Sequence, residues 1–365
     1  MFQHYLENNP LPIGPFWKKE PTEASVQLVF REYCKPGDIV FDIGANKGAL
    51  SKLMSRFVGP KGIVCAFEAS PRVIELLHYN LVLAGCHNVT VYNRAVYHET
   101  GAKVGLYEVS HLNESLYNTY SPLDKRDATL DDQVLTVTLD DFVDQSGLVP
   151  SFIKIDIEGA ELDALRGAHK LLSQHKPTLV LEQGPTVMHC YEHLRGLGYI
   201  AIDLADYRRL PTAADFAAGQ PIMDILYVHE SKAKDDPYWN IGEPDLVADI
   251  EASDLVNTSG ADFSMKTPLI LGPGRYVCLA DFSATNDQNH YYVGVKGREG
   301  EYVRYSAGLK LLADCYAKWV FHLFDEDTIT PYIQCINQPD PTLQINGFKV
   351  FAFNGMDKVQ RSVFE

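Results

Sequence analysis

Acidic residues end two apolar, strand-length runs near the N-terminus of the sequence, and glycines follow the first of them. Residues 40–48 read VFDIGANKG, so Asp42 ends the first run and Gly44 and Gly48 come directly after it. Enzymes that bind NAD carry G-x-G-x-x-G at this point, where backbone amides and a helix N-terminus hold a pyrophosphate. The pattern here is D-x-G-x-x-x-G, and a carboxylate at Asp42 repels a pyrophosphate but attracts an ammonium or a sulfonium group.

S-adenosylmethionine (SAM) carries both of these cations. The second acidic residue, Glu68, ends the run GIVCAFE one strand–helix unit later, where an acidic side chain accepts hydrogen bonds from ribose hydroxyls. A glycine after a strand also occurs in ordinary turns, and an acid there can serve only as a helix cap. Because both acids stand at the expected places, the two runs together favour a SAM site over a dinucleotide site.

Three more carboxylates are expected at the same edge of the fold. Asp156 ends the apolar run FIKID, Glu158 begins the following helix, and Glu182 ends the run LVLE. Carboxylates that converge raise one another's pKa, which suits a general base. We expect Asp156 or Glu158 to be the base and Glu182 to orient the substrate or SAM, with Lys154 tempering the negative charge. Glu161 is expected to be a surface residue.

Other interpretations of these carboxylates stay open. Glu158 could be only a favourable charge at a helix N-terminus, and three carboxylate oxygens could bind Mg²⁺, although we expect no metal. Substrate contacts are expected from His111 and Ser115 in the polar segment SHLNESLYNTY, a candidate lid, and from His189 in a loop near the crevice.

The elements that must position these residues alternate between strands and helices over residues 1–230. Strand-like runs such as DIVFDIG and TLVLEQG alternate with helix-like segments such as PRVIELLHYNLVLAG. The alternation predicts an α/β fold with a mostly parallel sheet and helices on both faces. Between residues 101 and 139 the pattern loosens, which indicates an inserted antiparallel extension beside the ligand crevice.

The sequence resembles the FkbM family of class I methyltransferases in segments that come in the family's order. They are VFDIGANKG, AFEASPRVIELLHYN, NRAV, VTLDDF, FIKIDIEGAELDALRGA and PTLVLEQG. KIDIEGAE is the most specific, and the likeness covers about residues 36–184, with a fainter match to about 230. The resemblance implies a Rossmann-like SAM-binding fold and O-methylation, mostly of hydroxyls on sugars or sugar-like natural products.

The resemblance also implies which residues hold SAM, all of them in or after the first two strands. The residues expected at its methionine and ribose part are Asp42, Gly44, Asn46 and Gly48. Glu68 is expected to hold the ribose, with Ala69 and Ser70 beside the adenine.

A second domain is expected after a charged linker over residues 233–246. Residues 247–365 contain short strand-like runs punctuated by turn residues, which predicts a small all-β sandwich. Its many aromatic residues, with Asn, Asp and Gln, are compatible with carbohydrate binding, but alternating aromatics in strands more often pack in a core. The first domain is expected to span residues 1–232, and a homo-oligomer could form through the β domain.

Composition limits the partners. The chain has 365 residues, a formal net charge of −16 and 46% apolar residues, so nucleic acid and anionic membrane surfaces are poor partners. No secretory signal and no membrane span are evident. The seven cysteines have no C-x-x-C spacing, which indicates reduced thiols and a cytoplasmic location.

The leading hypothesis is a SAM-dependent O-methyltransferase acting on a hydroxyl of a saccharide or glycan. One alternative is the same chemistry on the hydroxyl of a non-sugar natural product. Another is a non-catalytic carbohydrate-binding or adaptor protein that retains SAM. An NAD-dependent oxidoreductase is disfavoured because G-x-G-x-x-G is missing.

Overall fold

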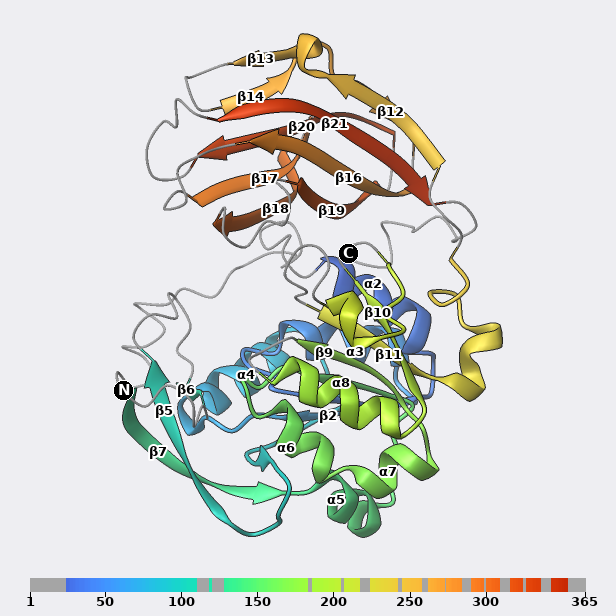
Figure 1. The fold of residues 1–365 in the computed structure, drawn as a ribbon. Helices are drawn as coiled ribbons and strands as arrows, with labels where there is room; N and C mark the ends of the chain where they lie inside the picture. The colour runs from blue at the N-terminus through green and yellow to red at the C-terminus, as the bar shows by residue number, and fades with distance from the viewer. Residues whose placement is uncertain are drawn as a thin grey trace. The chain divides into compact units, whose positions relative to one another are not determined.

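The computed structural model describes residues 24–109, 118–119, 128–182, 186–204, 207–216, 224–241, 245–257, 262–272, 274–283, 290–298, 300–308, 316–323, 326–335 and 343–353. The described residues fall into two compact units. The first holds those of 26–202 and 223–234, and the second holds those of 203–222 and 235–365 (Figure 1). Each unit has its own sheets and its own core.

A seven-stranded mixed sheet forms the centre of the α/β unit, in the order β10-β11-β9-β8-β1-β2-β3. β1 runs parallel to β2 and β8, and β11 is antiparallel to β9. Strands such as β8 (FIKI) consist mainly of apolar residues because both of their faces are buried. The strands are β1 Ile39–Ile43, β2 Ile63–Phe67, β3 Val89–Tyr92, β8 Phe152–Ile155, β9 Thr178–Glu182, β10 Tyr199–Asp203 and β11 Asp224–His229.

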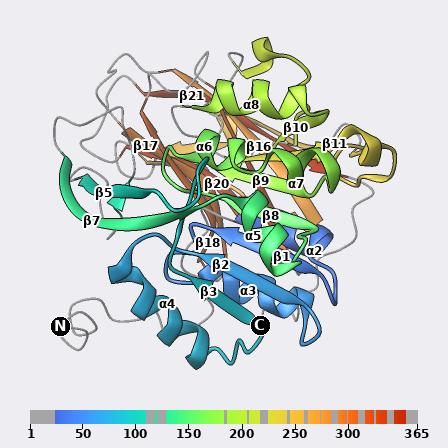
Figure 2. The ribbon, with the colours of Figure 1, turned by 90° about the horizontal axis from the view of Figure 1, so that it is seen from below.

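Helices cover both faces of this sheet, as expected (Figure 2). The α-helices are α2 Ala24–Tyr33, α3 Ala49–Val58, α4 Pro71–Leu83, α5 Leu139–Ser146, α6 Glu161–Arg166, α7 His169–Gln174 and α8 Val187–Gly196. Short 3-10 helices span Ala213–Phe216, Glu230–Asp235 and Ala252–Asp254. None of the helices in the described residues is long and apolar enough to cross a membrane.

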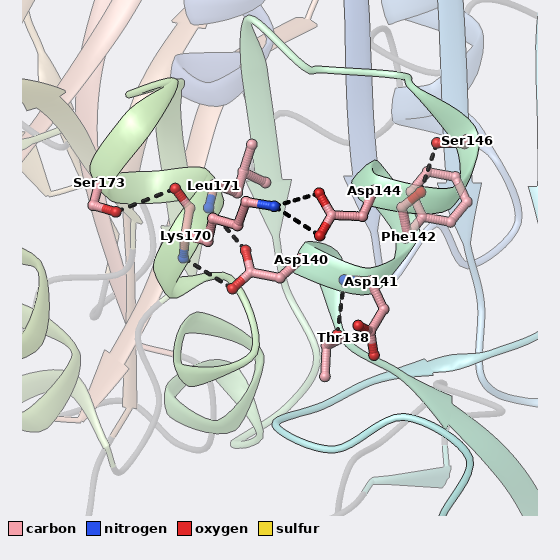
Figure 3. A network of polar contacts seen from close by, with 9 residues as sticks. All are labelled: Thr138, Asp140, Asp141, Phe142, Asp144, Ser146, Lys170, Leu171 and Ser173. Atoms are coloured by element: carbon pink, nitrogen blue, oxygen red, sulfur yellow. Dashed lines mark hydrogen bonds and ion pairs between the residues drawn. The ribbon is translucent and has the colours of Figure 1, made fainter.

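Polar contacts fix where α5 and α7 begin (Figure 3). The Thr138 hydroxyl oxygen caps α5 by accepting a hydrogen bond from the backbone N–H of Asp141 at 3.0 Å. The Asp140 carboxylate accepts hydrogen bonds from the backbone N–H groups of Lys170 and Leu171, at 2.9 and 2.8 Å. One acidic residue of α5 thus satisfies two amides at the start of α7, where negative charge is favourable.

The loosened stretch after β3 forms a small four-stranded sheet of order β4-β7-β5-β6. β5 pairs antiparallel with β7 and β6, which agrees with the predicted extension. Val104 and Leu106 of β5 are buried with Val134 of β7, against Ala69 and Tyr97. The strands are β4 Ala95–Val96, β5 Lys103–Val109, β6 Asn118–Thr119 and β7 Ala128–Val137. The extension thereby packs beside the end of β2.

The second unit is built of antiparallel strands around one core, as the short strand-like runs predict. Sheet β12-β21-β16-β19 and sheet β13-β14-β20-β17-β18, with β15 paired to β20, contribute residues to that core. The strands are β12 Asp245–Glu251, β13 Leu255–Asn257, β14 Asp262–Met265, β15 Leu269–Leu271, β16 Gly274–Ser283, β17 His290–Gly297, β18 Gly300–Gly308, β19 Tyr316–Leu323, β20 Asp327–Cys335 and β21 Gln344–Phe353.

Three aromatic residues of this unit show how its rings are used. Tyr276 and Phe321 stack with ring centroids 5.3 Å apart, and both are buried. Tyr332 is also buried. These rings therefore belong to the core and offer no face to a sugar.

Candidate functional site

The turn after β1 is tied to the end of β2 by one carboxylate. Glu68 Oε2 accepts a hydrogen bond from the backbone N–H of Asn46 at 2.8 Å, and Oε1 accepts one from the backbone N–H of Ser70 at 2.8 Å. These bonds hold Asn46 in a left-handed conformation, with φ 51°. Each oxygen keeps a lone pair, so Glu68 can brace the turn and still accept hydrogen bonds from a diol.

Two glycines in this turn are required by close approach. Gly44 has φ +82°, and a Cβ there would lie 1.8 Å from the carbonyl oxygen of Asp156. Gly48 has φ +87°, and its Cβ would lie 2.6 Å from Cδ1 of Leu77. Any side chain at Gly44 would push the turn away from the loop that carries Asp156.

A cavity opens where the ends of β1, β2 and β8 meet the extension. Five of the residues predicted to hold a cofactor line it: Gly44, Asn46, Glu68, Ala69 and Ser70. Val104 and Leu106 of β5 add an apolar wall, and Arg94 adds a cation. Among the described residues, Asn46 Oδ1 and Ser70 Oγ are buried without a hydrogen-bond partner, so the lining retains polar atoms for a ligand.

Asp42 and Gly48, also predicted to contact the cofactor, do not line this cavity. Asp42 is fully buried beneath the turn, where its Oδ2 accepts a hydrogen bond from the Ser51 hydroxyl at 2.5 Å. Burial raises the pKa of Asp42, and the charge of Lys154 opposes this rise. Asp42 therefore supports the turn from below, and Gly48 ends the turn directly before α3.

The three predicted catalytic carboxylates come together beside this cavity. Asp156, Glu158 and Glu182 each offer an oxygen, and these oxygens lie within 4.8 Å of one another. Lys154 Nζ lies 2.7 Å from Asp156 Oδ2, and the Lys154 side chain is only 7% exposed. Such a group of oxygens can hold a metal ion, but here a lysine already balances one of the charges. The expectation of no metal stays a prediction.

Asp156 and Glu182 of this cluster differ in their pKa values. Burial raises the pKa of Asp156, but Lys154 and a hydrogen bond with Glu182 outweigh burial and hold that pKa below its usual value. Burial and the neighbouring Asp156 raise the pKa of Glu182 to about 10. At neutral pH, Asp156 is therefore ionised, and Glu182 carries a proton that it donates to Asp156.

Glu158 lies at the exposed side of the cluster, on a left-handed backbone with φ 55°. Lost solvation and the charges of Asp156 and Glu161 raise the pKa of Glu158. Glu158 also lines the cavity, so its carboxylate can meet a ligand.

The expectation that Glu161 is a surface residue is wrong. Its relative exposure is 2%, and Oε1 accepts hydrogen bonds from the backbone N–H groups of Ile157 and Gly159 at 3.2 and 3.0 Å. The turn before α6 folds over this side chain because its amides need an acceptor. An acidic residue two positions after Gly159 was the available sequence signal.

Of the predicted substrate residues, His189 is the one that the structure describes. His189 is exposed on α8 and is not among the residues that line the cavity. His111 and Ser115, with most of the candidate lid, lie outside the described residues. Sequence reasoning missed Val104, Leu106 and Arg94 as lining residues, although it placed the segment of Val104 and Leu106 beside the crevice.

The stretch that builds this site matches a known family. Residues 42–201 match the family model described as the methyltransferase FkbM domain. This stretch is similar to a methyltransferase FkbM domain. It runs from the end of β1 into β10 and includes Glu68 and the three carboxylates. No curated protein sequence matches the chain.

Solved structures of methyltransferases resemble the FkbM domain and its surroundings at low identity. Methyltransferase FkbM from Methylobacillus flagellatus KT is 20% identical, with TM-score 0.36, over 53% of this chain and 44% of that one. A SAM-dependent O-methyltransferase from Thermotoga maritima is 16% identical, with TM-score 0.35, over 57% and 65%. Aeropyrum pernix fibrillarin, in complex with natively bound SAM, is 13% identical, with TM-score 0.33, over 54% and 68%. This chain therefore spans less than half of the first of these structures.

Proposed function

We propose that this protein is a SAM-dependent O-methyltransferase that acts on a hydroxyl of a saccharide or glycan. The observation that carries the proposal is the Asp156 carboxylate, which lies 2.7 Å from the buried Lys154 Nζ and within 4.8 Å of oxygens of Glu158 and Glu182, beside the cavity. The FkbM domain supports methyl transfer, and the cavity lining supports the cofactor.

The residues around the cavity fit SAM. Glu68 would accept hydrogen bonds from the two ribose hydroxyls, Ala69 and Ser70 would lie beside the adenine, and the turn from Gly44 to Asn46 would hold the methionine part. SAM supplies an electrophilic methyl group on its sulfonium. The chain's own task is to hold the acceptor hydroxyl in line with that methyl group and to take its proton.

Asp156 is the proposed base for this step. Its carboxylate would accept the proton of the acceptor hydroxyl, and bound SAM would supply the methyl group. Lys154 keeps Asp156 ionised despite its burial, and the proton on Glu182 fixes the orientation of the Asp156 carboxylate. Glu158 is placed to accept a second hydrogen bond from the acceptor.

A neutral, hydroxyl-rich acceptor suits this surface. The chain carries a formal net charge of −16, which repels polyanions, and the carboxylates of the cluster accept hydrogen bonds from adjacent hydroxyls. The hydroxyl of a non-sugar natural product is the alternative acceptor. The third possibility, an adaptor that retains SAM without turnover, requires that no acceptor is methylated.

The remaining organisation is proposed with this function. The domain bounds proposed are a SAM-binding domain over residues 1–232, a linker over 233–246 and a β domain over 247–365 that holds a glycan or a second subunit; the described residues of 203–222 group with the second compact unit. Five described cysteines are free thiols: Cys34, Cys65, Cys86, Cys190 and Cys278. Their reduced state supports the cytoplasm as the proposed compartment.

The test has two stages. Calorimetric titration with SAM, S-adenosylhomocysteine and NAD should show binding of the first two only. Transfer of a labelled methyl group from SAM should then be measured against a panel of sugars, glycans and non-sugar alcohols, with Asp156→Asn as the variant. Turnover on a glycan that Asp156→Asn loses supports the proposal. NAD binding, or SAM binding without turnover on any acceptor, would overturn it.

A further inference from the structure

The loop between β8 and α6 has an uncommon backbone at the point where it reaches the cavity. Glu158 and the following Gly159 both have positive φ, at 55° and 109°. This region is sterically disfavoured for residues with a Cβ, so Glu158 adopts it only because its surroundings hold it there. The site therefore includes a local strain that some other group must maintain.

Glu161 is the group that maintains it. Its Oε1 accepts hydrogen bonds from Ile157 N–H and Gly159 N–H, the amides on either side of Glu158. Successive backbone amides that converge in this way form a concave site for an anion, and here the chain supplies the anion itself. Glu161 is buried, and its Oε2 has no hydrogen-bond partner among the described residues, so its contact with the loop is made through Oε1.

The two carboxylates in the loop are fixed in different ways. Asp156 is fixed by the sheet, because its backbone N–H donates a hydrogen bond to the carbonyl oxygen of Ile43 at 3.0 Å. Its side chain is fixed by the hydrogen bond from Lys154 Nζ. Glu158 is exposed, so its position depends on the backbone beneath it. Glu161 fixes that backbone through its hydrogen bonds to the backbone N–H groups of Ile157 and Gly159.

We propose that Glu161 is a positioning residue whose carboxylate clamps the left-handed backbone at Glu158 and so keeps the Glu158 carboxylate against Asp156 and Glu182. The proposal rests on the proposed function. Glu161 does not touch the reacting atoms and acts through Glu158 alone. Without the clamp the loop relaxes, Glu158 leaves the cluster, and the acceptor loses one of its two carboxylate contacts.

Substitutions at Glu161 test the length of the side chain separately from its charge. Glu161→Asp keeps the charge but is one methylene too short to reach both amides. Glu161→Gln keeps a carbonyl oxygen at the same distance and removes the charge. Glu161→Met fills the same buried space without an acceptor and takes the place of Glu161→Asp should that variant fail to fold. Glu192→Asp, on the exposed face of α8, is the matched control.

Each variant is measured by calorimetry with SAM, by thermal melting, by carboxyl ¹³C NMR titration of Glu158, and by methyl transfer to the best acceptor of the panel. In Glu161→Asp, the pKa of Glu158 should fall toward its ordinary value, and kcat should fall at least about 10-fold. The dissociation constant of SAM should stay within about twofold, because Glu68 and Asn46 are untouched. Glu161→Gln should keep kcat within about threefold, and Glu192→Asp should match the native protein.

A Glu161→Asp variant with the native Glu158 titration and the native kcat would overturn the proposal. A variant that only melts earlier would also overturn it, since a purely structural residue changes stability and leaves the Glu158 titration as it was. Failure of the native protein to bind SAM would refute the proposed function instead. The NMR titration of Glu158 would still test the clamp in that case.

Discussion

Two Lys–Asp pairs of nearly equal length allow the electrostatics of the site to be tested without an acceptor. Lys154 Nζ lies 2.7 Å from Asp156 Oδ2, and the two side chains are 7% and 23% exposed. Lys170 Nζ lies 2.6 Å from Asp144 Oδ1, and these side chains are 48% and 55% exposed (Figure 3). The pairs have similar geometry and differ in their access to water.

Lys154→Met should therefore cost far more stability than Lys170→Met. Removing one partner of a buried ion pair costs about 3–5 kcal/mol, because the other charge stays buried without compensation. Since Asp156 keeps some exposure, we expect about 3 kcal/mol at pH 8, the lower end of that range. Lys170→Met should change the free energy of unfolding very little, because water solvates Asp144.

The loss in Lys154→Met should also depend on pH in a defined direction. In the native protein the pKa of Asp156 is lowered, so the pair's contribution is present above the unfolded pKa of Asp and is lost as pH falls through the folded value. In Lys154→Met, burial raises the pKa of Asp156 instead. The folded variant then takes up a proton, and its deficit shrinks as pH falls toward about 4, near the unfolded pKa.

Urea unfolding of the native protein and both variants at pH 8, 6 and 5 measures these differences. The expected result is a large deficit for Lys154→Met at pH 8 that narrows at pH 5, and no comparable deficit for Lys170→Met at any pH. An equal loss of unfolding free energy in the two variants, or a loss in Lys154→Met that does not change with pH, would refute a buried ionised pair at the site.

Three further predictions concern the same cavity. Glu68→Ala should weaken SAM binding about 100-fold or more in calorimetry, since two charge-assisted hydrogen bonds of about 1.5–3 kcal/mol each are lost; Glu75→Ala, on the exposed side of α4, should leave it unchanged. Glu182→Gln should be more stable than the native protein in urea, by a margin that grows from pH 4.5 to about 10, because native Glu182 must keep its proton over that range; a margin independent of pH would argue against the protonated carboxyl. Gly44→Ala should melt several degrees earlier and bind no SAM, because its Cβ would lie 1.8 Å from the Asp156 carbonyl oxygen; native melting and binding would contradict this close approach.

The parts of the site that stand at strand ends could be predicted from the sequence. Asp156 and Glu182 follow apolar runs, and parallel strands deliver their carboxyl ends to one edge of the sheet. Glu68 follows from the same rule, and Gly44 follows from the need for a tight turn. The period and length of the apolar runs therefore predicted both the fold class and the approximate position of these side chains.

The parts that depend on backbone direction could not be predicted. Glu161 reads as an ordinary acidic residue in the first turn of a helix, and only the left-handed backbone at Glu158 turns two amides toward it. For the same reason the sequence predicted only part of the role of Glu68. Its hydrogen bonds to the backbone N–H groups of Asn46 and Ser70 depend on how the turn folds back onto β2. For Tyr276, Phe321 and Tyr332 of the β unit, the sequence did not decide between a place in the core and a sugar-binding surface, because only burial shows which it is.

The arrangement of charge explains why three carboxylates can share one edge of the sheet. If all three carboxyl groups were ionised, their mutual repulsion would oppose folding. The chain reduces this repulsion by placing a positive charge beside one of them, Asp156. Lys154 neutralises Asp156, Glu182 keeps its proton, and Glu158 takes the most exposed position, where water screens its charge. The same three features keep Asp156 ionised at neutral pH, but the lowered pKa makes it a weak base, so the expectation of a raised pKa is wrong for this residue. In the proposed reaction Asp156 therefore acts mainly by holding the acceptor hydroxyl in line with the methyl group.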